Sequence, residues 1–257
     1  MKGRASRLAY RTIVTKEVLR FLRIWLQTLM PPAVTTGLYF LIFGELIGAQ
    51  LGPVAGLRYV DFIAPGVILM AVITNSYSNV VSSFFSTKYQ RYVEELLIAP
   101  VPNAVILAGY VTGGVLRGIA VGVVVSLVAL PFTQIHLHSA PVAALTLVLT
   151  SALFATAGFI NALFAKSFDD ISVVPTFVLT PLTYLGGVFY SVDMLPEPWQ
   201  QLSLANPILY MVSAFRAGLL GVADVPLGAA FGITGAFLVG LTALALVLLG
   251  RGVGLKS

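Results

Sequence analysis

Residues 62–85 read FIAPGVILMAVITNSYSNVVSSFF and contain no charged side chain. A helix rises 1.5 Å per residue, so about 20 mostly apolar residues cross the roughly 30 Å hydrocarbon core of a bilayer. The stretch is therefore long and apolar enough to be a transmembrane helix. It also carries a polar stripe at helical spacing, which consists of Asn75, Asn79, Ser82, Ser83 and the following Ser86.

Five more apolar blocks satisfy the same length criterion, at 31–48, 104–130, 141–165, 171–190 and 227–249. The chain has 257 residues, of which 58% are hydrophobic, so six spans leave no room for a folded soluble domain. We therefore predict an all-α membrane protein with six transmembrane helices. A basic segment (1–27) precedes the transmembrane domain (28–250), and a short tail (251–257) follows it.

The chain has no cysteine, which excludes disulfides and cysteine-based metal or redox sites. His136 and His138 alternate in a loop without a carboxylate or cysteine companion, so we predict no metal site there.

The net charge of +5 is concentrated next to the membrane, because seven of the fifteen Lys and Arg residues lie in the first 23 residues. Such a location is typical of topology signals and anionic lipid, not of nucleic acid. The side of the membrane that holds both termini carries twelve of the basic residues, whereas the opposite side carries only Arg58 and Arg216. The positive-inside rule therefore predicts that both termini are cytoplasmic.

The basic segment reads as two amphipathic pieces whose cationic faces differ by about half a turn. The phase slips at residues 12–15, which predicts a helix break there with Thr15 as N-cap. We expect the second piece to lie flat on the cytoplasmic leaflet, with Trp25 at headgroup level. A flexible basic tail is the alternative.

Two kinds of pattern indicate close packing between spans. The polar stripe should face a neighbouring helix or, alternatively, the substrate. Rows of small residues in the third and sixth spans allow backbones to approach closely, without identifying the partner helix. These rows comprise Gly109, Gly113, Gly114, Gly118 and Gly122, and Gly228, Gly232, Ala236 and Gly240.

Residues 181–226 contain five prolines and the Gly186-Gly187 pair, which divide the stretch into apolar pieces of about ten residues. Pieces of this length re-enter the membrane or lie at its interface. We predict two short external helices, at about 197–204 and 208–220.

TKYQRYVEELLIAP (87–100) predicts an amphipathic helix over 88–98 in the first cytoplasmic loop. One face would carry Tyr89, Tyr92, Val93 and Leu96, and the other Lys88, Arg91, Glu94 and Glu95, with Arg91 and Glu95 spaced for an ion pair. No soluble domain of this chain could cover such a helix, so one face is available to a separate protein. A solvated surface turn is the alternative.

Two charges lie at membrane depth. A charge there costs at least about 2.5–3.5 kcal/mol, so a partner is expected. One hypothesis pairs Glu45 with Arg117; the other places Glu45 at the outer interface and Arg117 on backbone carbonyls. Five aromatic residues near the outer end of the fifth span form an interfacial belt or an exit gate, namely Tyr184, Phe189, Tyr190, Trp199 and Tyr210.

The sequence resembles the transmembrane subunits of ABC-2 type exporters, which include polysaccharide, teichoic acid, nodulation-factor and drug-efflux permeases. The resemblance covers nearly the whole chain and is strongest in RFLRIWLQTLMPP, FIAPGVILMAVITNSYSNVVSSFF and EELLIAPVP, and in the block from Phe168 to Arg216. It implies a coupling helix at 88–98, re-entrant helices before the last span, and two permease copies with two separately encoded ATPases. Asp169 and Asp170 would then contact the ATPase or remain solvated.

None of the five lysines follows a glycine, so the phosphate-binding sequence GxxxxGK[ST] is absent. We therefore expect no cofactor in this chain and expect the partner ATPase to bind ATP and Mg²⁺. One rival interpretation is a secondary transporter or channel that uses Arg117, Glu45 and the polar stripe, although no inverted repeat is found. A second is an intramembrane enzyme, but neither GxSxG nor HExxH occurs.

Overall fold

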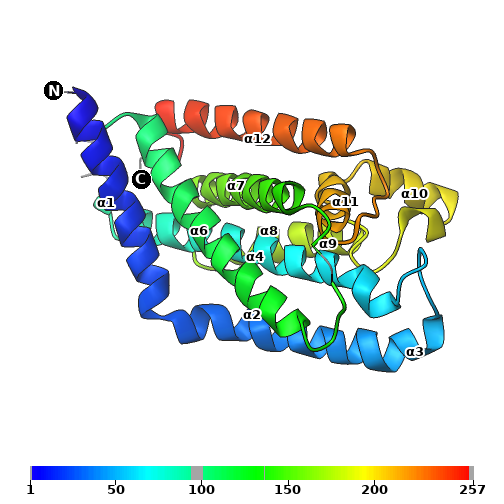
Figure 1. The fold of residues 1–257 in the computed structure, drawn as a ribbon. Helices are drawn as coiled ribbons and strands as arrows, with labels where there is room; N and C mark the ends of the chain where they lie inside the picture. Colours follow the sequence, from blue (N-terminus) through cyan, green and yellow to red (C-terminus); the bar gives the residue numbers. More distant parts are fainter. Residues whose placement is uncertain (1, 94–100, 136, 255–257) are drawn as a thin grey trace.

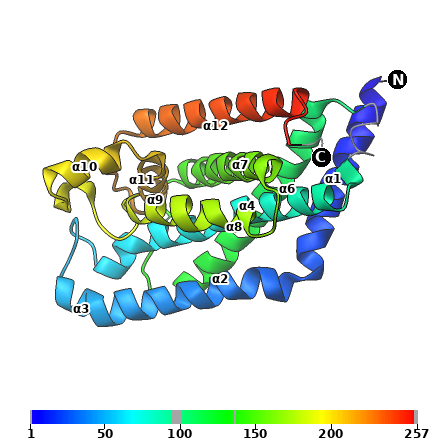
Figure 2. The ribbon, with the colours of Figure 1, turned by 180° about the vertical axis from the view of Figure 1, so that it is seen from behind.

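Long apolar helices run along a common axis in the computed structural model, which describes residues 2–93, 101–135 and 137–254. Figures 1 and 2 show α4 (Tyr59–Tyr89), α7 (Ala140–Phe164) and α12 (Leu227–Gly250) along this axis, with α6 (Asn103–Ala129) crossing obliquely. We call the end of the bundle at which α1 lies the α1 end, and the opposite end the α10 end. The first residues of α1 and the last turn of α12 both lie at the α1 end (Figure 1).

Within the described residues, five helices are long and apolar enough to cross a membrane. They correspond to five of the six predicted spans, at Trp25–Gly44, Tyr59–Tyr89, Asn103–Ala129, Ala140–Phe164 and Leu227–Gly250. The first of these comprises α2 (Trp25–Tyr39) and part of the π-helical η1 (Phe40–Ile47), and α3 (Gly48–Leu51) follows it. Among them α4 is the central helix: most of its side chains are buried, chiefly against α6 and α7.

The predicted fifth span at 171–190 is shorter and less regular than expected. It consists of α8 (Asp170–Val174), the π-helical η2 (Pro175–Leu179) and α9 (Thr180–Tyr184). Pro175 and Pro181 lack the N–H that a regular helix needs, and the hydroxyl of Thr180 donates to the carbonyl of Pro175. The helical part is only about 22 Å long and ends at Tyr184, before a turn that leads to the α10 end.

The basic N-terminal segment is a single helix, so the predicted break at residues 12–15 is wrong. α1 (Lys2–Arg23) continues through this region, and the hydroxyl of Thr12 donates to the carbonyl of Leu8 within the helix. The chain bends only at Ile24, and α1 runs across the end of the bundle instead of along it (Figures 1 and 2). Packing of Ile13 and Phe21 against the bundle outweighs the shift in the charge pattern.

The two short helices predicted near the C-terminal end are confirmed as α10 (Glu197–Leu204) and α11 (Pro207–Leu220), after the short 3-10 helix η3 (Val192–Met194). The side chain of Asn206 caps α11 by accepting from the N–H of Ile208, and Gly221 ends it in the left-handed conformation at φ 75°. α11 packs among α4, α7 and α12.

The two rows of small residues behave differently. On α6, a Cβ added to Gly109 would lie 2.7 Å from Cγ2 of Ile13, and one added to Gly113 would lie 2.5 Å from Cβ of Glu17. α1 therefore packs closely against this part of the row on α6. On α12, a Cβ at Gly228, Gly232 or Gly240 would meet no atom of the described chain within 4 Å.

Candidate coupling and transport sites

Lys88 joins the last turn of α4 to the end of α7. Its Nζ donates to the carbonyls of Leu163 and Ala165, each at 2.7 Å, where α7 leaves its last carbonyl groups without helical partners. A cation at a helix C-terminus is favourable both for hydrogen bonding and for the helix dipole. A displacement of the loop that follows Lys88 would therefore act on two spans.

The predicted helix over 88–98 does not begin as expected. Lys88 and Tyr89 still belong to α4, and a turn follows in which Arg91 adopts a φ of 63°. Helical backbone resumes at Tyr92 and Val93, while Glu94, Glu95 and Leu96 lie outside the described residues. Tyr89 and Tyr92 are more than half exposed, whereas Val93 is buried. Two aromatic rings are thus presented next to the turn.

The second loop at the α1 end contacts this region through Phe168. Its ring lies 4.9 Å from that of Phe85 and 5.2 Å from that of Tyr89. Asp170 accepts from the backbone N–H groups of Lys166 and Ser167, and these donors together with the Ser167 hydroxyl hold the pKa of the exposed carboxyl below its usual value. The Asp170 carboxylate therefore stabilises the conformation of its own loop through these hydrogen bonds.

A buried polar cluster fastens α1 to α4, and sequence reasoning missed its central residue. Glu17 is fully buried; it accepts from Ser83 at 2.5 Å and from Arg20 at 3.1 Å. The same Arg20 nitrogen donates to the side-chain and backbone oxygens of Asn79, at 2.8 and 2.9 Å. Glu17 is the first acidic residue of the chain and lies among seven cations, and this isolation was the signal available in the sequence.

The polar stripe of α4 therefore has two roles. Asn79 and Ser83 hold α1, as the helix-contact interpretation predicted. Asn75 lies further along the helix, and its Oδ1 accepts from Arg117 at 3.1 Å. Arg117 and Asn75 line a cavity of about 350 Å³ between α2, α4 and α6.

The hypothesis that Arg117 pairs with Glu45 finds no support in these contacts. Gly37 of α2 lies beside Val128 of α6, because a Cβ added to Gly37 would lie 3.6 Å from Cγ1 of Val128. Arg117 lies about 16 Å before Val128 on α6, whereas Glu45 lies about 12 Å beyond Gly37 towards the α10 end. The side chain of Glu45 is outside the described part of the structure, but the two backbones are at different depths.

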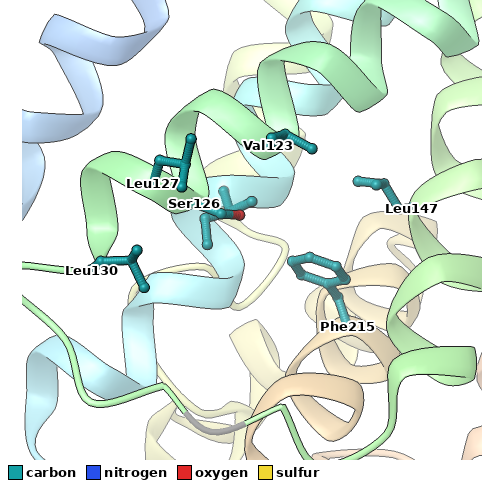
Figure 3. A pocket seen from close by; sticks show the side chains of 8 residues that line it. Val123, Ser126, Leu127, Leu130, Leu147 and Phe215 are labelled. Carbon is teal, nitrogen blue, oxygen red and sulfur yellow. The ribbon is translucent and has the colours of Figure 1, made fainter.

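A second, apolar pocket of about 240 Å³ lies between α6, α7 and α11. Val123, Leu127, Leu130, Leu147 and Phe215 surround Ser126 there (Figure 3). This lining suits a hydrocarbon segment and offers no charged group.

The predicted aromatic residues divide into separate groups. Tyr184 and Phe189 stack at 5.7 Å and join Tyr39 and Phe43 of the first span, with ring centroids of Phe43 and Phe189 5.1 Å apart. Trp199 is instead exposed on α10, Tyr210 donates to the carbonyl of Leu204, and the buried hydroxyl of Tyr190 has no partner in the described chain. Of the five aromatic residues, Tyr184 and Phe189 thus contact each other and the first span.

Arg216 is a fully buried cation at the α10 end. It forms an ion pair with Asp224, donates to the carbonyl of Gly187 at 2.6 Å, and lies 4.0 Å from the ring centroid of Phe62. Ser191 donates to the other oxygen of Asp224 at 2.6 Å. This cluster ties α11 and the loop after it to the turn after α9 and to the start of α4.

The described part of the chain thus has five membrane-length helices, a basic helix across one end and a cavity lined by Arg117, which is the architecture of a multi-pass helical membrane protein. Residues 9–220 match the ABC-2 type transporter family, and the chain belongs to that family.

The chain is 57% identical over 250 residues, 97% of this chain and 98% of the relative, to the inner membrane transport permease YadH of Escherichia coli K12. It is 27% identical to nodulation protein J of Rhizobium leguminosarum bv. viciae over 189 residues, 72% of this chain and 71% of the relative. Nodulation protein J of Rhizobium meliloti strain 1021 is 26% identical over 196 residues, 74% and 73% of the two chains. The protein is thus an inner membrane transport permease by family.

Proposed function

We propose that this chain is the permease subunit of an ATP-driven exporter, in which a separately encoded ATPase drives the export of a lipid-like, glycan or drug-like substrate. The sequence contains no GxxxxGK[ST] motif, so the energy of ATP hydrolysis must come from a partner. The chain itself would be non-catalytic. Two permease copies and two ATPase subunits would form the complex.

The α1 end is the cytoplasmic end in this proposal. The basic residues of α1, Lys88, Arg91, Lys166 and Arg251 all belong to segments at this end, as the positive-inside rule requires. α1 runs across the bundle at the level expected for the cytoplasmic leaflet, and Trp25 is exposed at its junction with α2.

The observation that carries the proposal is the linkage of the first loop to three other elements. Lys88 binds the end of α7, Phe85 and Tyr89 contact Phe168, and Glu17 with Arg20 binds α4 a few turns above the loop. A force applied by a partner to the exposed tyrosines would therefore be transmitted to α4, α7 and α1 together. Packed elements move as units because their interfaces resist continuous deformation.

Charge reversal in the first loop tests this proposal. The full-length chain is co-expressed with a candidate partner ABC ATPase, and the complex is assayed for ATP hydrolysis in proteoliposomes. We expect the double variant Glu94→Arg and Glu95→Arg to lose stimulation of the ATPase by the permease. Reversed charges at a contact surface oppose association by several kcal/mol.

A matched control reverses two carboxylates at the opposite end. Asp193 and Glu197 are exposed, so Asp193→Arg with Glu197→Arg changes the net charge equally and should leave stimulation intact. Equal behaviour of the two double variants would contradict coupling through the first loop. Substrate transport by the chain alone, without nucleotide, would contradict the exporter and favour the secondary-transporter alternative.

A further inference from the structure

Arg117 is a cation without a counter-ion in the described chain. Its Nη2 donates to the amide oxygen of Asn75, and its Nε is buried without a hydrogen-bond partner. The three ion pairs among the described residues involve other cations, Arg20, Arg58 and Arg216. Arg117 is half-buried in the middle of α6, and an uncompensated charge at membrane depth is unfavourable, so its retention indicates that a negative group completes the site.

The cavity next to Arg117 has room for such a group. It has a volume of about 350 Å³ and lies between α2 and the less buried face of α4. Thr35, Thr74 and Ser78 contribute hydroxyl groups, while Pro32 and Met70 contribute apolar surface. A pocket with one cation, several hydroxyls and apolar walls is suited to an amphipathic ligand with an anionic head.

The depth of the site distinguishes a transported molecule from a structural lipid. Asn75, which binds Arg117, lies about 21 Å from the end of α4 at Tyr89 and about 24 Å from its start at Tyr59. Arg117 lies about 21 Å along α6. Both values place the guanidinium near the middle of the bundle, whereas the headgroup of a resident bilayer lipid stays at the interface.

We propose that Arg117 and the cavity beside it bind the anionic head of an amphipathic substrate, such as a phosphate, sulfate or carboxylate ester, during its passage through the protein. The assignment of this ligand as cargo rests on the proposed export function. Asn75 acts as a positioning residue, because its Oδ1 holds Nη2 of Arg117 where the side chain lines the cavity.

Binding of radiolabelled dodecyl phosphate to the purified full-length chain tests the proposal. The chain is placed in phosphatidylcholine nanodiscs without ATPase or nucleotide, and binding to empty nanodiscs is subtracted. We expect saturable binding that Arg117→Gln weakens about tenfold or more, because a charge-assisted contact is lost in a low dielectric. Arg117→Lys should retain most of the affinity.

Ser78→Leu provides an independent test if Arg117→Gln does not fold. It narrows the cavity and leaves Arg117 in place, so it should also weaken binding. The matched control is Arg251→Gln, which removes an exposed cation at the end of α12 and should bind as the unmodified chain does.

Competition distinguishes the class of ligand. Unlabelled dodecyl phosphate should displace the probe, and dodecyltrimethylammonium should not. Displacement by inorganic phosphate at the same concentration would overturn the assignment to an amphipath. Unchanged binding in Arg117→Gln or Ser78→Leu would overturn the site itself. The binding assay contains no ATPase, so a failure to bind dodecyl phosphate would leave the exporter proposal intact. That proposal is tested separately by charge reversal in the first loop.

Discussion

Glu17 shows how one residue changes the role of a whole segment. The seven cations around it predict a helix that rests on the membrane surface, yet its carboxylate is fully buried against α4. A buried carboxylate is tolerated only where it is hydrogen-bonded and paired, and Ser83 and Arg20 meet both conditions. α1 is therefore an integral part of the bundle.

We predict that Glu17→Ala lowers the thermal stability of the purified permease. The substitution leaves Arg20 without its ion pair and Ser83 without its acceptor, which we expect to cost about 1–3 kcal/mol because Arg20 is partly solvated. Thermal unfolding in detergent, followed by near-ultraviolet circular dichroism, measures the change. Glu197→Ala, at an exposed position on α10, is the control; equal losses in both variants would refute the assigned role of Glu17.

Among the helices, α1 and α6 provide the clearest interface. Gly109 and Gly113 lie about one helical turn apart on α6, and a residue of α1 packs against each of them. The backbones of α1 and α6 therefore approach as closely as small residues allow. This contact, together with the polar cluster on α4, holds α1 across the end of the bundle. The contact explains why α1 is continuous although its charge pattern predicts a break.

We predict that Gly113→Ala destabilises the docked position of α1, whereas Gly232→Ala does not. Both changes remove a mid-helix glycine and gain about 1 kcal/mol of helix propensity. Only at Gly113 does the new Cβ meet another atom, Cβ of Glu17 at 2.5 Å. Trypsin cleavage within α1 should therefore become faster in Gly113→Ala alone. Equal cleavage rates in the two variants would argue against close packing at Gly113.

At the scale of the whole molecule, the two ends of the bundle are held together by different clusters of charged side chains. The α1 end is joined by Glu17, Arg20 and Lys88, and the α10 end by Arg216 and Asp224. The middle holds Arg117, a cation without a carboxylate partner in the described chain. In the proposed export function, Arg117 therefore lies between two ends that ion pairs and hydrogen bonds hold together.

We predict strong coupling between Arg216 and Asp224 in a double-mutant cycle. Arg216→Gln alone leaves a buried carboxylate unpaired and should cost about 3–5 kcal/mol. Adding Asp224→Asn removes that unpaired charge, so the double variant should be more stable than the sum of the single losses predicts. Chemical unfolding of all four proteins gives the coupling energy, and additive losses would show that the pair does not act as a unit.

Apolar length and proline positions alone determined the course of the chain: five spans and both short helices, α10 and α11, occur close to where these patterns predict them. The fifth predicted span occurs as a shorter and irregular segment, because Pro175 and Pro181 lie within an otherwise apolar block and interrupt its helix. The length of a span depends on the hydrocarbon thickness, and a helix is interrupted where proline lacks its N–H. Both effects depend on consecutive residues, so they can be predicted from the sequence alone.

Tertiary packing alone decided which polar groups meet. Glu17 with Ser83, Arg216 with Asp224, and Arg117 with Asn75 come from different helices or turns, and no spacing along the chain relates them. The Glu45–Arg117 pairing stays a hypothesis for the same reason, since the relative depth of two residues on crossing helices depends on how the helices pack. Burial energies depend on three-dimensional contacts, so the partners of a charge follow from the packed bundle and not from its order in the sequence.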